Sequence, residues 1–170
     1  MLRILLLDDE ENIVKSLQRM LRSSRWDIDI FTEPREALRA VETTRYAIIV
    51  SDFRMPDVNG VEFLEYCKLR QPEALRLILS AQCDRDAVVD AINKAEIYRF
   101  LNKPWDPYEL QQTLQRAADH YELQQEYHRV MELAEKQRDK LKRLEREHPD
   151  LVRVEWDEDG AIVLDTGADD

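Results

Sequence analysis

Apolar positions follow two different spacings over the first 105 or so residues of this chain. Five short runs are rich in aliphatic and aromatic residues, and they lie at Leu2–Leu7, Ile28–Phe31, Ala47–Ser51, Leu75–Ser80 and Tyr98–Leu101. Nearly continuous apolar runs of this length are typical of strands that are buried on both faces of a parallel sheet.

Amphipathic stretches separate these runs, with apolar residues recurring at helical spacing. The stripes are Ile13, Val14, Leu17 and Leu21; Ala37, Leu38 and Val41; Val61, Phe63, Leu64 and Cys67; and Val88, Val89 and Ile92. Helix starts are indicated by Thr32 before Pro34, by Asp84 and by Asp106-Pro107. The pattern predicts a strand followed by a helix five times over, which is the α/β class with a doubly wound parallel sheet.

The last of these helices is expected to be unusually long. No Gly or Pro occurs between Pro107 and Pro149, so we expect one helix over 107–147, about 60 Å long at 1.5 Å per residue. Its apolar positions follow the alternating spacing of four and three residues that favours a coiled coil and a homodimer. They are Leu123, Tyr127, Val130, Ala134, Leu141 and Leu144, and Gln137 is the one clearly polar member of the series. The alternative is a single solvated helix that packs back on its own domain.

The segment after Pro149 has a third character. Leu151–Trp156 and Ala161–Leu164 are β-prone and flank an Asp159-Gly160 turn signal, which predicts a small β-hairpin. We therefore expect a domain over 1–120, the long helix over 107–147, and a hairpin with an acidic tail over 148–170.

Composition and charge narrow the class of protein. The 170 residues are 44% hydrophobic and carry a net charge of −11, so we expect a folded chain that does not bind nucleic acid. The last sixteen residues contain seven acids and no base, so most of the excess negative charge lies there. Cys67 and Cys83 lack metal or disulfide spacing, and no run is long enough to span a membrane. We expect reduced thiols and a cytoplasmic location.

Polar residues follow the predicted strands where the strands end. The first predicted strand ends in Asp8, Asp9 and Glu10, the third in Asp52, the fourth in Ser80 and the fifth in Lys103. Ligands of open α/β sheets bind at this edge. Clustered carboxylates repel one another, which favours a divalent cation such as Mg²⁺. With Lys103 and Ser80 beside it, such a site suits a phosphoryl group, and a carboxylate is a competent nucleophile for it.

Four sequence segments carry a family resemblance. LLLDDE, SDFRMPDVNG, LILSA and FLNKPW, in this order and spacing, resemble the receiver domain of two-component response regulators over residues 1 to about 120. The resemblance implies a flavodoxin-like five-stranded sheet in the order 2-1-3-4-5. It also implies that Asp52 accepts a phosphoryl group from a histidine kinase or a phosphotransfer protein, with Mg²⁺ as cofactor.

Further roles follow from the same resemblance. Asp9 matches the direct Mg²⁺ ligand, Asp8 its partner acid, and the backbone carbonyl of Arg54 completes the protein ligands together with Asp52. Lys103 matches the lysine that binds the phosphoryl group. Ser80 matches the switch hydroxyl, Phe100 the aromatic rotamer switch, and Pro104 the proline that follows a cis peptide bond.

Individually, these residues have simpler interpretations. Asp8 or Glu10 would serve as a helix cap, Asp52 as a turn residue, and Phe100 as a core aromatic. Ser80 and Lys103 would be an ordinary turn hydroxyl and a solvated charge.

An enzyme is not expected, because aspartyl phosphotransferases of the haloacid-dehalogenase type carry a second Asp where this chain has Arg54, and the only Asp-His pair is reversed as Asp119-His120. We expect a response regulator whose output is binding to an unidentified protein. The alternatives are a coiled-coil adaptor whose receiver is only a docking face, and a regulator of a separate signalling enzyme such as a cyclic-dinucleotide enzyme.

Overall fold

The fold was analysed in a computed structural model of the chain. The structure describes residues 2–22, 25–56, 58–81, 94–148, 155–156 and 162–163. The chain divides into two units, residues 1–124 and 125–170, which are described separately. Among the described residues, no helix is both long enough and apolar enough to cross a membrane.

The first unit contains the predicted strands and helices. In chain order they are β1 (Arg3–Leu7), α1 (Glu11–Leu21), β2 (Asp27–Phe31), α2 (Pro34–Thr43), β3 (Ile48–Asp52), α3 (Gly60–Arg70), β4 (Leu75–Ala81), β5 (Arg99–Lys103) and the first part of α5 (Pro107–Glu147). The helix predicted around Val88, Val89 and Ile92 lies outside the described residues, as does Cys83.

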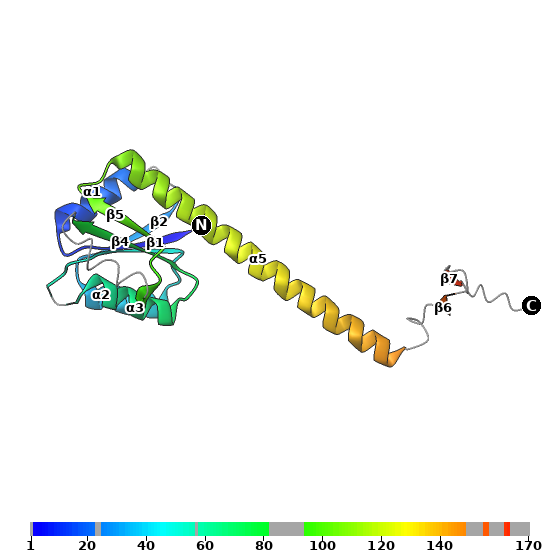
Figure 1. Cartoon of the computed structure of the whole chain (residues 1–170). Helices are drawn as coiled ribbons and strands as arrows, with labels where there is room; N and C mark the ends of the chain where they lie inside the picture. Colours follow the sequence, from blue (N-terminus) through cyan, green and yellow to red (C-terminus); the bar gives the residue numbers. More distant parts are fainter. Residues whose placement is uncertain are drawn as a thin grey trace, which may run out of the picture. The chain divides into compact units, whose positions relative to one another are not determined.

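The five strands form one sheet in the order β2-β1-β3-β4-β5, with every neighbouring pair parallel. This is the order that the sequence predicts. Central β3 is buried at each of its residues, because helices cover both faces of the sheet. Figure 1 shows α2 and α3 on one face and α1 with the start of α5 on the other.

Each face of the sheet contributes to a separate apolar cluster, because side chains alternate along a strand. On one face Leu5, Ile49 and Ile78 pack with Phe63 and Leu64 of α3. The other face holds Ile4, Leu6, Ile48, Leu17 of α1, and Leu110 and Leu114 of α5. The amphipathic stripes of α1, α2 and α3 therefore face the sheet as predicted.

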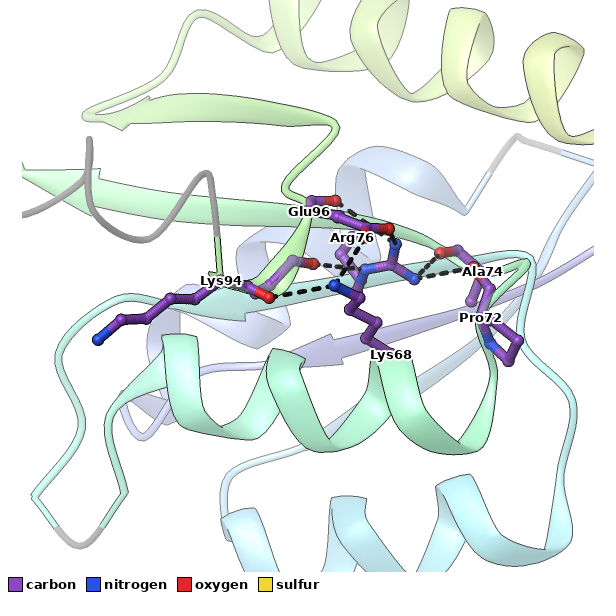
Figure 2. A network of polar contacts seen from close by, with 7 residues as sticks. Lys68, Pro72, Ala74, Arg76, Lys94 and Glu96 are labelled. Carbon is purple, nitrogen blue, oxygen red and sulfur yellow. Dashed lines mark hydrogen bonds and ion pairs between the residues drawn. The ribbon is translucent and has the colours of Figure 1, made fainter.

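A buried arginine joins the beginning of β4 to the segment before β5. The Arg76 side chain is 6% exposed. Its Nε donates to the carbonyl of Ala95 at 2.8 Å, and its Nη1 donates to those of Ala74 at 2.6 Å and Pro72 at 3.2 Å. These hydrogen bonds satisfy carbonyls that belong to two separate parts of the chain (Figure 2).

Two further residues extend this network. Lys68 of α3 donates to the carbonyl of Lys94 at 3.4 Å and forms an ion pair of 2.6 Å with Glu96. Glu96 has a positive φ of 48° and also lies 3.6 Å from Nη2 of Arg76. The network thus fixes residues 94–96 against α3 and β4 (Figure 2).

Helix α5 begins and ends where the sequence predicts. It spans Pro107–Glu147, and Asp106 caps it by accepting a hydrogen bond of 2.8 Å from the Glu109 amide. In the second unit, β6 (Glu155–Trp156) pairs antiparallel with β7 (Ile162–Val163). This pairing agrees with the predicted hairpin, whose turn at Asp159-Gly160 lies outside the described residues.

Candidate functional site

The ends of four parallel strands bring the predicted site residues to one edge of the sheet. Asp8 and Asp9 follow β1 directly, and Asp52 is the last residue of β3. Ser80 and Lys103 lie near the ends of β4 and β5, where the register pairs Ala81 with Lys103. The parallel register is the reason that residues so distant in sequence meet.

Lys103 connects two of the acids. Its Nζ lies 2.6 Å from Oδ2 of Asp8 and 2.6 Å from Oδ1 of Asp52. The Asp8 side chain is fully buried and that of Asp52 is 9% exposed, whereas the Lys103 side chain is 19% exposed. One ammonium group therefore links the end of β5 to the ends of β1 and β3.

Backbone amides hold the remaining carboxylate oxygens. The amide of Glu10 donates to Oδ1 of Asp8 at 3.0 Å, and the amide of Arg54 donates to Oδ2 of Asp52 at 3.1 Å. Each carboxylate is thus fixed on one side by the turn that follows its strand. Glu10 occupies the N-cap position of α1, in agreement with the interpretation of Glu10 as a cap, although its side chain makes no capping hydrogen bond.

The start of α3 packs closely on Asp52. The Asn59 side chain caps this helix by accepting a hydrogen bond of 2.9 Å from the Val61 amide, and the Gly60 amide donates to the Phe53 carbonyl at 3.1 Å. A Cβ at Gly60 would collide with the backbone carbonyl of Asp52. The absence of a side chain at Gly60 therefore permits this turn to approach the strand end.

Burial and charge oppose each other in this cluster. Burial raises the pKa of the Asp8 and Asp52 carboxyl groups above their ordinary value, and the Lys103 ammonium offsets part of that rise. Burial lowers the pKa of Lys103, but its hydrogen bonds to Asp52 and Asp8 outweigh this effect and raise the pKa overall. The ammonium is therefore stabilised in its charged form.

The acids fit a small divalent cation. One oxygen from each of Asp8, Asp9 and Asp52 lies within 4.8 Å of the others. Three carboxylates and one ammonium carry a formal charge of about −2, which leaves the cluster short of positive charge. Oxygen ligands from a few carboxylates, completed by water, are what Mg²⁺ prefers. The donor set therefore suits that ion.

The two candidate switch residues lie on adjacent strands. Ser80 is 5% exposed on β4, one residue past Leu79, which is opposite Asp52 in the register. Phe100 on β5 is partly buried and packs against the cluster that α3 covers. The Lys103–Pro104 peptide bond is cis, in agreement with the resemblance.

Sequence reasoning did not identify two contributors to this site. The Arg54 amide and Gly60 shape the surroundings of Asp52, although both residues lie inside the SDFRMPDVNG segment. An Asn-Gly pair directly before an apolar helical stripe was the available signal for the helix start.

Comparison with protein families gives a match to the response regulator receiver domain over residues 4–115. The hydrogenase transcriptional regulatory protein HoxA of Cupriavidus necator is 32% identical over 112 residues, which are 66% of this chain and 23% of HoxA. The alkaline phosphatase synthesis transcriptional regulatory protein PhoP of Bacillus subtilis is 31% identical over 64% of this chain and 45% of its own length. The chain therefore spans less than half the length of these relatives.

Solved structures agree with this match. The signal receiver domain of an HD domain-containing protein from Pseudomonas fluorescens Pf-5 has a TM-score of 0.68 and 30% identity, covering 71% of this chain and 97% of that one. The chemotaxis protein CheY4 of Vibrio cholerae has a TM-score of 0.64 and 25% identity, covering 69% and 98%. The fold expected from the sequence is therefore confirmed.

Proposed function

Because this chain belongs to the family of response regulator receiver domains, we propose that it is a phosphorylation-dependent regulator in which Asp52 accepts the phosphoryl group. One observation carries the proposal: Asp52 ends β3 in contact with Lys103 and in a cluster with Asp8 and Asp9. This arrangement places a carboxylate nucleophile beside the positive charge that phosphoryl transfer needs.

Asp8, Asp9, Asp52 and the backbone carbonyl of Arg54 would hold Mg²⁺. When bound, the ion supplies positive charge to the oxygens of the transferring group. The buried Asp8 oxygen that faces Lys103 has no hydrogen-bond partner besides that ion pair within the described part of the chain, which supports a cation site here.

The protein's own residues position the nucleophile. An oxygen of Asp52 forms the new bond to phosphorus while the bond from phosphorus to the donor's nitrogen breaks. The Arg54 amide holds Oδ2 of Asp52 at 3.1 Å, so the carboxylate is oriented before the donor arrives. Lys103 then exchanges its carboxylate contacts for the phosphoryl oxygens, where its charge is worth most.

The donor is a histidine kinase or a phosphotransfer protein, and the output is binding to another protein. Phosphorylation adds about −1.5 to −2 of charge at the edge of the sheet. The Ser80 hydroxyl on the neighbouring strand is suited to bond the new oxygens, and Phe100 on β5 responds by changing rotamer. The surface formed by β5 and the start of α5 would then differ between the two states.

Labelling with acetyl phosphate tests this function. The wild type is expected to form an acid-stable, base-labile acyl phosphate in the presence of Mg²⁺ and to lose labelling with excess chelator. Asp52→Asn is expected to abolish it, and Asp9→Asn is expected to reduce it strongly at a given Mg²⁺ concentration. Exposed Asp106→Asn serves as a matched control and is expected to label normally, because it lies at the start of α5. Equal labelling of Asp52→Asn and the wild type would refute the proposal.

A second candidate is an adaptor that works through α5 without phosphorylation. The exposed apolar side chains along this helix favour it, since such a face indicates an interaction surface. The two candidates differ in one measurable respect. Beryllofluoride, which mimics the phosphoryl group, changes partner binding only if the receiver is a switch. A separate signalling enzyme is one possible partner in either case.

A further inference from the structure

We propose that a second copy of this chain binds the exposed apolar face of α5 in parallel orientation and forms a two-stranded coiled coil over residues 127–144. The proposal concerns the second unit and does not depend on phosphorylation of Asp52. It says which partner covers the apolar stripe of α5, and in which orientation. The stripe consists of Tyr127, Val130, Ala134, Gln137, Leu141 and Leu144.

The stripe is exposed in the single chain although four of its residues are large and apolar. Tyr127 is 61% exposed, Val130 52%, Leu141 53% and Leu144 42%. The start of the same helix differs, because Leu110 there is 1% exposed against the sheet. The second part of α5 thus has an exposed apolar face, which is the condition in which a partner helix stabilises it.

The spacing of the stripe fits a copy of itself. Tyr127, Ala134 and Leu141 occupy one core position of a seven-residue repeat, and Val130, Gln137 and Leu144 occupy the other. On both flanks of the small Ala134, Met131 and Leu133 are also exposed, at 45% and 51%. They widen the apolar contact where the core residue is smallest.

Charges beside the stripe favour the parallel arrangement. In a parallel pair, the residue directly before Tyr127, Ala134 or Leu141 on one helix meets the residue five positions later on the other helix. Lys140 of each copy then faces Glu145 of the other, which gives two attractive contacts. The remaining flanking pairs join Glu126 to Met131 and Leu133 to Arg138, and none of them brings two like charges together.

The antiparallel alternative is worse in both of its registers. Pairing Tyr127 with Leu144 keeps the same six core positions, but it places Glu126 opposite Glu147 at each end. A shift by one repeat brings Glu126 opposite Lys140 instead. That shift leaves Leu144 without an apolar partner and packs Tyr127 against Gln137.

The polar core residue supports the same orientation. A polar side chain at one core position fixes register and orientation. In the parallel pair the two Gln137 carboxamides lie side by side, where each can donate to and accept from the other. In the antiparallel register with six core positions, Gln137 instead faces Ala134, whose methyl group offers no hydrogen bond.

Disulfide cross-linking of the full chain tests the orientation. Tyr127→Cys and Leu144→Cys are made separately, with Glu132→Cys on the opposite face of the helix as matched control. The native Cys67 and Cys83 are present in all of them and in the wild type. A parallel pair cross-links each of the first two variants with itself. Cross-linking only in a mixture of the two would overturn the proposal, since residues 127 and 144 lie about 25 Å apart on one helix.

Light scattering tests whether the partner of α5 is one second copy of this chain. The wild type is expected to have the mass of a dimer at tens of micromolar, with or without Mg²⁺ and acetyl phosphate. Val130→Lys with Leu141→Lys is expected to give a monomer that still labels at Asp52. The control Glu132→Lys with Asp139→Lys adds charge away from the stripe and is expected to remain dimeric. A monomeric, trimeric or tetrameric wild type would each overturn the proposal.

Discussion

Arg76→Met removes every donor of the buried guanidinium and keeps a flexible, unbranched apolar side chain in place of the arginine stem. Arg76 is 5% exposed, and three of its contacts to carbonyl oxygens are 3.2 Å or shorter. Methionine cannot bond any of them, so the carbonyls of Ala74 and Ala95 lose this donor inside the protein. We expect the variant to fold with a markedly lower free energy of unfolding.

The size of this loss follows from two opposing effects. A buried carbonyl that loses its partner costs about 1–3 kcal/mol, and two short hydrogen bonds are removed. Against this, the variant avoids the free-energy cost of burying a charged group. Burial disfavours the charged guanidinium of Arg76 and lowers its pKa for the same reason. The expected net loss is about 3 kcal/mol, within the range for breaking a buried charged contact. At roughly 2–4 °C per kcal/mol, the melting temperature is expected to fall by about 6–12 °C.

Urea and thermal unfolding followed by circular dichroism measure the effect. Lys68→Met is the control, because Lys68 contacts the same segment but is 30% exposed and is expected to matter much less (Figure 2). Unfolding of Arg76→Met at the wild-type urea concentration, or equal destabilisation of Lys68→Met, would contradict the stabilising role of the Arg76 hydrogen bonds.

Three further outcomes are expected. Gly60→Ala is expected to lower the free energy of unfolding in urea by about 1–3 kcal/mol and to slow labelling of Asp52, because the added Cβ meets the Asp52 carbonyl. Unchanged unfolding and labelling of this variant would contradict the expectation. Lys103→Gln is expected to slow acetyl phosphate labelling on the order of tenfold to hundredfold, and wild-type rates would contradict its role. Burial and the hydrogen bond to Asp29 raise the pKa of Tyr46 above 10.0 in the folded protein. The neutral Tyr46 hydroxyl therefore contributes to the free energy of unfolding below that pH, and this contribution is lost as the pH rises above it. Tyr46→Phe is expected to lose less stability than the wild type between neutral pH and about pH 11, and identical stability curves for the two proteins would contradict this.

The sheet and its order could be anticipated from the sequence for physical reasons. Strands buried on both faces are apolar along most of their length, so β1, β3 and β4 appear as nearly continuous apolar runs. The strand order came from the family resemblance and not from the runs themselves. The length of α5 followed from the lack of Gly and Pro between Pro107 and Pro149.

The apolar runs are shorter than the strands that they indicate. The third and fifth runs end at Ser51 and Leu101, whereas β3 and β5 continue to Asp52 and Lys103, the residues expected at these strand ends. Polar residues at a strand end still take part in the ladder when their backbone pairs, and hydrophobicity does not report that pairing. The prediction that these residues gather at one edge was unaffected.

Side-chain contacts were beyond the reach of pattern reasoning. That Lys103 contacts both Asp8 and Asp52 depends on the register of three strands and the twist of the sheet. Arg76 was passed over although it is a charged residue in an apolar run, which is the signal for a buried, bonded side chain. Two of its partners, Ala95 and Glu96, lie nineteen and twenty residues later, and local sequence gives no indication of them.

The most direct test of the phosphoacceptor assignment locates the modified residue chemically. The chain is phosphorylated with acetyl phosphate and Mg²⁺, reduced with borohydride, digested and sequenced by mass spectrometry, since reduction converts an aspartyl phosphate to homoserine. We predict homoserine at position 52 alone, with Asp8 and Asp9 unchanged. Homoserine at position 8 or 9 would contradict the assignment of Asp52. The absence of homoserine from a sample that carries the phosphoryl label would also contradict it.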